Sequence, residues 1–153
     1  MLYPVIIIII IALDQISKLL AYNLMDISES IPLIENFLHI TLWTNPGAAF
    51  GILPHQRLFF IVVTILVTVV LSYYIYKLPS EKWVLKLAFS LQIGGALGNL
   101  IDRIYLGEVI DFIDFKIWSP IFNVADIAIV VGVALFALDV LVFDMIQEKT
   151  GEG

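Results

Sequence analysis

The sequence predicts an all-α membrane protein with four transmembrane helices and a small β-rich segment outside the membrane. Three observations lead to this class. Apolar residues make up 61% of the 153 residues and charged residues only 14%, far from the averages of soluble domains. The apolar residues gather in runs long enough to cross roughly 30 Å of hydrocarbon. Most of the acidic residues lie in the polar intervals between those runs.

The four predicted spans cover about residues 3–24, 58–76, 83–101 and 121–142, within a single domain of residues 1–153. The first contains six consecutive isoleucines, Ile6 to Ile11. It lacks the basic start and the small-residue cleavage site of a removable signal peptide, so we expect it to be retained as a span. Glycines interrupt the third span, and such small residues allow neighbouring helices to approach closely.

The outer β-rich loop is predicted at about residues 26–57. Its central run, from Phe37 to Thr44, is rich in aromatic and β-branched residues and predicts one or two short strands. The sequence Asn45-Pro46-Gly47 then predicts a turn. The segment at residues 47–51 is small and apolar, which suits close packing or re-entry at the membrane interface.

The placement of basic residues predicts the orientation of the chain. Lys77 and Lys82 flank the short connection between the second and third spans, whereas the longer outer loop carries only Arg57. By the positive-inside rule, this connection and both termini are expected on the cytoplasmic side. This orientation brings four polar residues to a similar depth near the outer leaflet: Asp14, Asn99, Asp102 and Asp126.

Charge and composition exclude several classes of function. The net charge is -6 and there is no basic patch to neutralise phosphates, so nucleic acid is not an expected partner. The absence of cysteine excludes disulfides, thiol nucleophiles and thiolate metal sites. Only two histidines are present, His39 and His55, which argues against a histidine-rich metal site.

Two of the acidic residues have a cation nearby in sequence. Asp14 and Lys18 are four residues apart, and Asp102 is followed directly by Arg103. Because buried charges are usually paired, we interpret both as supporting pairs that satisfy one another. Asn99 shares a helix face with Asp102 and Arg103.

Asp111 and Asp126 differ from these pairs. Neither has a lysine, arginine or histidine three or four residues away, and both are bordered by apolar residues. An unpaired carboxylate in a dry site has a raised pKa, and two facing carboxylates can share one proton. In aspartic proteases one such carboxylate activates water while its protonated partner polarises the carbonyl.

The residues alone leave other hypotheses open. Asp111 and Asp126 could be unrelated interfacial acids, or could form a carboxylate metal site with Asp114. Intramembrane acids could also serve as the relay of a small proton-coupled carrier. A structural assembly factor is a further possibility. Asp139, in the fourth span, has no obvious partner.

Five blocks of the sequence resemble a known family and occur in that family's order. They are Asp14-Gln15-Ile16-Ser17-Lys18, Asn45-Pro46-Gly47-Ala48-Ala49-Phe50-Gly51, the segment from Gly94 to Arg103, Val109-Ile110-Asp111-Phe112 and Phe122-Asn123-Val124-Ala125-Asp126. With these blocks the chain resembles lipoprotein signal peptidase, or signal peptidase II, an aspartic protease of the bacterial inner membrane. Each block alone is weak evidence, but five in order are highly specific.

The resemblance implies four spans with a small extracytoplasmic β-cradle. It also implies removal of the signal peptide from diacylglyceryl-modified prolipoproteins, just before the lipid-modified cysteine. The active site is expected near the outer leaflet, in contact with membrane lipid. No metal or cofactor is implied, and a monomer is expected.

By motif position the catalytic dyad is Asp111 and Asp126. The Asp-Phe pair at Asp114 is a second possible match, but the context of Asp111 fits the family better. The remaining matched residues are expected to support the dyad or contact substrate: Asp14, Lys18, Asn45, Gly47, Asn99, Asp102, Arg103 and Asn123. The chain departs from the family at Pro46, where threonine is usual, and at Ile127, where serine is frequent.

Overall fold

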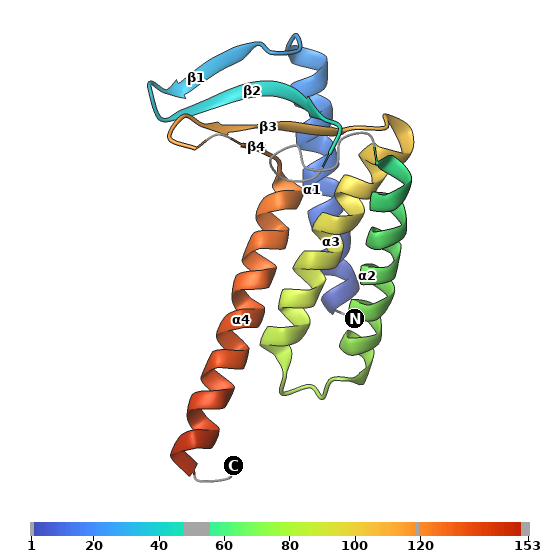
Figure 1. Cartoon of the computed structure of the whole chain (residues 1–153), viewed down its shortest axis with the longest axis vertical. Helices are drawn as coiled ribbons and strands as arrows, with labels where there is room; N and C mark the ends of the chain where they lie inside the picture. Colours follow the sequence, from blue (N-terminus) through green and yellow to red (C-terminus); the bar gives the residue numbers. More distant parts are fainter. Residues whose placement is uncertain (1, 48–55, 119, 151–153) are drawn as a thin grey trace.

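The computed structural model describes residues 2–47, 56–118 and 120–150, with side chains described up to residue 141. Four helices and four strands follow in the order α1 (Leu2–Leu24), β1 (Ser30–Ile34), β2 (Leu38–Asn45), α2 (Arg57–Lys77), α3 (Trp83–Tyr105), β3 (Val109–Phe115), β4 (Ile121–Phe122) and α4 (Val124–Thr150). The sheet covers one end of the helices, and the α2–α3 connection lies at the other end (Figure 1). The predicted re-entry segment at residues 48–51 lies outside the described residues.

Within the described chain, four helices are long and apolar enough to cross a membrane. Their apolar segments are Leu2–Leu24, Arg57–Lys77, Trp83–Tyr105 and Val124–Leu141. Together with the small antiparallel sheet, they confirm the predicted fold class. The chain therefore has the architecture of a multi-pass membrane protein.

Two predicted span boundaries are wrong. The fourth helix begins at Val124 and not at residue 121, because Ile121 and Phe122 pair with β3 as strand β4. The third helix continues past residue 101 to Tyr105. It ends there because Gly107, with φ +88°, takes the left-handed conformation that closes many helices and donates its N–H to the Asp102 carbonyl at 3.2 Å.

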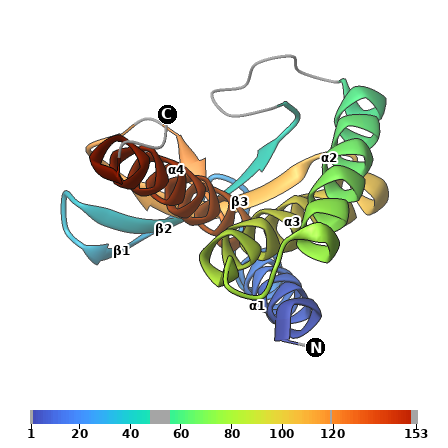
Figure 2. The same ribbon diagram turned by 90° about the horizontal axis from the view of Figure 1, so that it is seen from below.

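Helix α3 is the centre of the bundle and packs against the other three helices (Figure 2). Small residues allow this close contact. A side chain at Gly95 would collide with the carbonyl oxygen of Ala125 on α4, and a Cβ at Gly98 would lie 2.6 Å from the Asp14 carboxylate on α1. In contrast, α2 buries no residue and rests mainly on α3.

The sheet is antiparallel with the strand order β1-β2-β3-β4. Two strands come from the predicted outer loop, as expected. Strand β3 comes from the polar interval between the third and fourth predicted spans, where no strand was predicted because two aspartates interrupt its apolar run, and β4 comes from the predicted start of the fourth span. Leu42, Ile110 and Phe112 pack together with Ala21 of α1 and fasten the sheet to the bundle. The strand that carries Asp111 is thereby held above the helix ends.

Candidate active site

Asp111 and Asp126 line the same cavity, which has a volume of about 330 Å³. The first carboxylate comes from the sheet and the second from the start of α4. The cavity has a polar side and an apolar side. Its other polar lining residues are Asn45, Gly47, Asn99 and Arg103. Its apolar lining residues are Val109, Trp118, Pro120, Ile121, Phe122, Ile129 and Val130.

Asp126 is positioned by a capping box at the start of α4. The side-chain oxygen of Asn123 accepts a hydrogen bond from the Asp126 N–H at 2.9 Å, and Asp126 Oδ2 accepts from the Asn123 N–H at 3.2 Å. This reciprocal pair satisfies two backbone donors at the helix terminus. The three-residue spacing therefore has a local structural cause, and it also points the carboxylate into the cavity.

Asn123 connects the two carboxylates. Its amide nitrogen donates to Asp111 Oδ1 at 2.7 Å, while its backbone N–H holds Asp126. Asn45, at the end of β2, donates to the other oxygen of Asp111 at 3.2 Å. Each carboxylate is thus held in place without a cation bound directly to it among the described residues.

The Asp111 side chain is in an environment that favours its protonated form. The residue is 2% exposed. Burial first, and the nearby Asp126 second, raise the pKa of Asp111 to about 7, against the opposing hydrogen bonds from Asn45 and Asn123. A carboxyl group with this pKa can hold or release a proton near neutral pH.

Asn99 joins the carboxylates to a buried ionic cluster. Its amide nitrogen donates to Asp126 Oδ1 at 2.8 Å. Its amide oxygen accepts from Asn123 at 3.1 Å and from the Lys18 ammonium at 2.8 Å. The orientation of the Asn99 amide is therefore determined on both sides.

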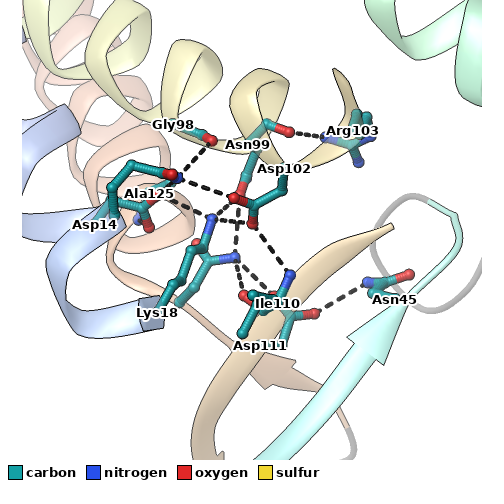
Figure 3. A network of polar contacts seen from close by, with 12 residues as sticks. Asp14, Lys18, Asn45, Gly98, Asn99, Asp102, Arg103, Ile110, Asp111 and Ala125 are labelled. Atoms are coloured by element: carbon teal, nitrogen blue, oxygen red, sulfur yellow. Dashed lines mark hydrogen bonds and ion pairs between the residues drawn. The ribbon is translucent and has the colours of Figure 1, made fainter. Parts of the chain in front are cut away.

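Lys18 is the centre of that cluster (Figure 3). Its ammonium lies 2.8 Å from both Asp14 and Asp102, and all three residues are at most 3% exposed. The interpretation of Asp102 and Arg103 as a pair is wrong, because helix packing brings Lys18 to Asp102 instead. Asp14 also accepts a hydrogen bond from the Ala125 N–H at 2.9 Å, which adds a negative charge at the N-terminus of α4.

Gln15 belongs to this cluster and was not assigned a role from the sequence. Its amide donates to Asp102 at 2.9 Å and to the Gly98 carbonyl at 3.1 Å. The sequence feature that could have identified Gln15 was its position next to Asp14, within one of the five blocks that resemble the family. Asp102 also accepts from the Ile110 N–H at 3.1 Å, which anchors the strand next to Asp111.

Arg103 contacts the edge of the cavity and not Asp102. Its guanidinium donates to the Gly47 carbonyl at 3.0 Å and to the Asn99 carbonyl at 3.4 Å. It also lies 4.8 Å from the centre of the Phe60 ring. These contacts tie the turn after β2 and the first part of α2 to the end of α3 that lies near the sheet. Across Pro46, the Gly47 N–H donates to the Asn45 side chain at 3.0 Å, so this turn forms despite the missing threonine.

Asp114 does not join the two carboxylates. It is the third residue after Asp111 on a strand, so the two side chains lie on opposite faces. Asp114 accepts from Thr41 at 2.7 Å and pairs with Lys116. Burial alone would raise its pKa, but the contacts with Lys116 and Thr41 outweigh this effect and lower it. In the described part of the chain, no three His, Cys, Asp or Glu side chains converge into a metal-binding group.

Asp139 has a partner, contrary to the sequence interpretation. Its carboxylate lies 3.6 Å from the Lys82 ammonium at the start of α3. This ion pair connects α3 and α4 at the end of the bundle opposite the sheet. It is far from the cavity along both helices and does not extend the cluster around Lys18.

Fold and site together define a multi-pass membrane protein with two carboxylates in one cavity, neither bound directly by a cation from the described residues. A family model described as Signal peptidase (SPase) II matches residues 6–142. Lipoprotein signal peptidase of Halothermothrix orenii is 49% identical over 97% of this chain and 98% of its own. The enzyme of the same name from Desulfitobacterium hafniense is 44% identical over 91% of this chain and 92% of its own.

Two solved structures, each titled as a bacterial membrane enzyme, have the same fold. One has a TM-score of 0.87 and covers 91% of this chain and 87% of its own. The other has a TM-score of 0.83, with coverage of 91% and 92%. Both are 39% identical to this chain.

The chain belongs to the signal peptidase II family. It is therefore a peptidase built from membrane-spanning helices, as the resemblance implied. The hypothesis of a proton-coupled carrier is not supported by these relationships.

Proposed function

We propose that this protein removes the signal peptides of lipoprotein precursors by aspartic chemistry, with Asp111 and Asp126 as the catalytic dyad. Family membership supports the activity. One observation supports the assignment of the dyad. The two carboxylates line one cavity from different elements and are linked through a single residue, Asn123, whose side chain holds Asp111 and whose backbone N–H holds Asp126.

In this mechanism Asp111 begins protonated and Asp126 begins ionised. The elevated pKa of Asp111, about 7, supports this starting state. Asp126 takes a proton from a water molecule, the water oxygen bonds to the scissile carbonyl carbon, and the Asp111 proton passes to the carbonyl oxygen. The C–N bond then breaks, the leaving amine takes the proton from Asp126, and the hydroxyl proton returns to Asp111. Both carboxyl groups end in their initial states.

The surrounding amides keep the two carboxylates in position. Asn45 and Asn123 hold Asp111, while Asn99 and the Asn123 backbone hold Asp126. Such positioning matters because a displacement of about 1 Å can cost roughly 100-fold in rate. Three further residues act indirectly: Lys18 holds Asn99, Asp14 holds the start of α4, and Asp102 holds β3 next to Asp111. Arg103 and Gly47 form the edge over which the substrate backbone passes. No cofactor is required.

The substrate is a precursor whose cysteine carries diacylglycerol. The cavity combines a polar wall, which suits a peptide backbone, with an apolar wall, which suits acyl chains. Ile129 and Val130 continue that apolar wall onto α4, and Val130 is 65% exposed. We infer that the signal helix enters laterally from the lipid, with its acyl chains along this wall.

The enzyme works as a monomer in the bacterial cytoplasmic (inner) membrane, with its active site near the outer leaflet. The connection between α2 and α3, with Lys77 and Lys82 at its ends, then faces the cytoplasm, as do both termini. The sheet lies on the outer side. Several exposed apolar side chains on β1 and β2, among them Leu33 and Trp43, suit contact with membrane lipid.

The test is cleavage of a diacylglyceryl-modified precursor in detergent by three single variants. Asp111→Asn and Asp126→Asn are expected to lower turnover by at least about 100-fold, in the range of lost general acid–base catalysis. Asp114→Asn is the matched control, because it changes a buried aspartate of the same strand that faces away from the cavity. It should retain cleavage. Full activity of Asp111→Asn or Asp126→Asn, with melting temperatures near that of the parent, would refute the dyad.

A further inference from the structure

The side chain of Gln92 lies near the midpoint of α3 and has no hydrogen-bond partner among the described residues. It is half-buried. Hydrocarbon offers no donor or acceptor, and an unsatisfied amide in an apolar environment costs several kcal/mol relative to water. A carboxamide at this depth is therefore expected to find a partner in the working state of the enzyme.

Gln92 is on the same face of α3 as Asn99. Seven residues separate them, which is close to two helical turns or about 10 Å along the axis. Asn99 lines the catalytic cavity and donates to Asp126. Gln92 therefore lies beneath the cavity, on its membrane side, and faces the same direction.

The helices on either side confirm this direction. Gln92 packs beside α4, because a Cβ added at Gly132 would lie 2.8 Å from its Cγ. About one turn further from the cavity along α3, the Phe89 ring centre lies 6.2 Å from that of Tyr74 on α2 and 5.7 Å from that of Phe136 on α4. This face of α3 is therefore bordered by α4 on one side and by α2 on the other (Figure 2).

We propose that Gln92 hydrogen-bonds the signal helix of the precursor within the membrane and thereby contributes to substrate selection. This inference rests on the function proposed above. A signal helix whose scissile bond is at Asp111 and Asp126 continues toward the membrane interior, and the α3 face beneath the cavity is its shortest route. The amide then meets the helix about 10 Å below the scissile bond, roughly seven residues upstream.

The chemistry of the amide predicts which precursors it favours. It can donate to a hydroxyl of Ser or Thr, or to a backbone carbonyl left accessible by Gly or Ala, as small and polar residues do at contacts between membrane helices. A Leu at the same position would cover the backbone and leave the amide unsatisfied. The enzyme should therefore prefer Ser over Leu at one position of the signal helix.

The test is a double-mutant cycle. A precursor with an otherwise all-Leu signal helix is given a single Ser at each position from about five to nine residues before the cleavage site, a window centred on the roughly 10 Å separation. Each precursor is cleaved by the parent and by Gln92→Met, which keeps the length of the side chain and removes the amide. At one position the preference for Ser, measured as kcat/KM, should fall by about 3-fold to 18-fold, as for hydrogen bonds between membrane helices. The change should be in KM and not in kcat.

Two controls complete the experiment. Thr68→Val removes another polar group of the helix bundle, a buried hydroxyl without a partner on α2, and should not change the preference. Gln92→Leu repeats the measurement if the methionine variant is poorly folded. Equal kcat/KM ratios at every position would refute the role of Gln92. A second outcome would also refute it: substitution of Gln92 changes the oligomeric state but not the preference for Ser. The amide would then bind a second copy of the chain.

The two proposals fail separately. If Asp111→Asn remains active, the catalytic dyad is wrong whatever Gln92 does. If Asp111→Asn is inactive and no Ser position responds to Gln92→Met, only the inference about Gln92 is wrong.

Discussion

The two ends of the helix bundle both hold an ion pair between helices, but in very different environments. At the sheet end, Lys18 lies 2.8 Å from Asp14 and Asp102, and the three side chains are at most 4% exposed. At the other end, Lys82 and Asp139 are 3.6 Å apart, with side chains 35% and 18% exposed. The residue types are the same, whereas the burial differs.

This difference explains why one cluster supports the candidate active site and the other does not. In a buried cluster each charge needs its partners, so the side chains have a single arrangement. Asn99 and Asn123 connect this cluster to the two carboxylates by hydrogen bonds and so fix their positions as well. In a partly exposed pair, water and lipid headgroups can replace either partner at little cost. The deep network therefore positions the two carboxylates of the cavity, while the shallow pair only joins two helix ends.

The largest effect is expected from Lys18→Met. Met retains most of the side-chain volume but leaves Asp14 and Asp102 without their cation. Removing one partner from a buried ionic cluster typically costs about 3–5 kcal/mol. We expect a large fall in the melting temperature in detergent and little folded, active enzyme. A variant that melts within a few degrees of the parent would mean that the buried cluster is no more important than the exposed pair.

The second-largest expected effect is a dependence of folding stability on pH, and it arises only at the sheet end of the bundle. The pKa of Asp111 is raised from 3.8 to about 7, so folding takes up a proton between these two values. The resulting stabilisation is complete below pH 3.8 and is lost as pH rises through about 7. The melting temperature should therefore decrease over this range more steeply for the parent than for Asp111→Asn.

The same titration predicts the alkaline side of the activity profile. Because the protonated form of Asp111 is required, kcat/KM should fall about tenfold for each pH unit above the pKa of this group. With the pKa of Asp111 at about 7, the fall should begin near neutral pH. A profile that stays level to pH 9 or above would contradict the assignment of Asp111 as the proton donor.

The smallest effect is expected from Asp139→Asn. A partly exposed ion pair contributes about 0–1 kcal/mol. The melting temperature should change by only a few degrees and cleavage should remain close to that of the parent. Asp102→Asn is the matched comparison, since it makes the same chemical change in the buried cluster. Equal losses in the two variants would show that burial does not separate the two ends.

The membrane spans could be predicted well from the sequence, although their ends could not. Hydrophobic length is a property of each segment alone, because a spanning helix satisfies its backbone internally. The start of α4 was placed too early because the apolar pair Ile121 and Phe122 looks the same in a helix or a strand. Strand β3 was missed because its two aspartates interrupt the apolar run, and the partners that allow their burial come from other parts of the chain.

The candidate site could be predicted only in part. The absence of nearby cations distinguished Asp111 and Asp126, and both line the cavity. The predicted pair of Asp14 and Lys18 is confirmed, but the partners of Asp102 and Arg103 could not be predicted in this way. Neighbouring Asp102 and Arg103 point to different partners, and Lys18 contacts Asp102 from another helix. Side chains adjacent in sequence project from a helix in different directions, so sequence proximity is a poor guide to pairing.

The sequence by itself determined the class of this protein: four apolar spans, acidic residues mostly between them and two carboxylates without local cations. Family motifs added the expected chemistry. The tertiary structure alone decided which charges meet. Strand periodicity separates Asp114 from Asp111, and the capping box at Asn123 turns Asp126 into the cavity. These choices depend on register and helix packing, which join residues from distant parts of the chain and therefore leave no local pattern in the sequence.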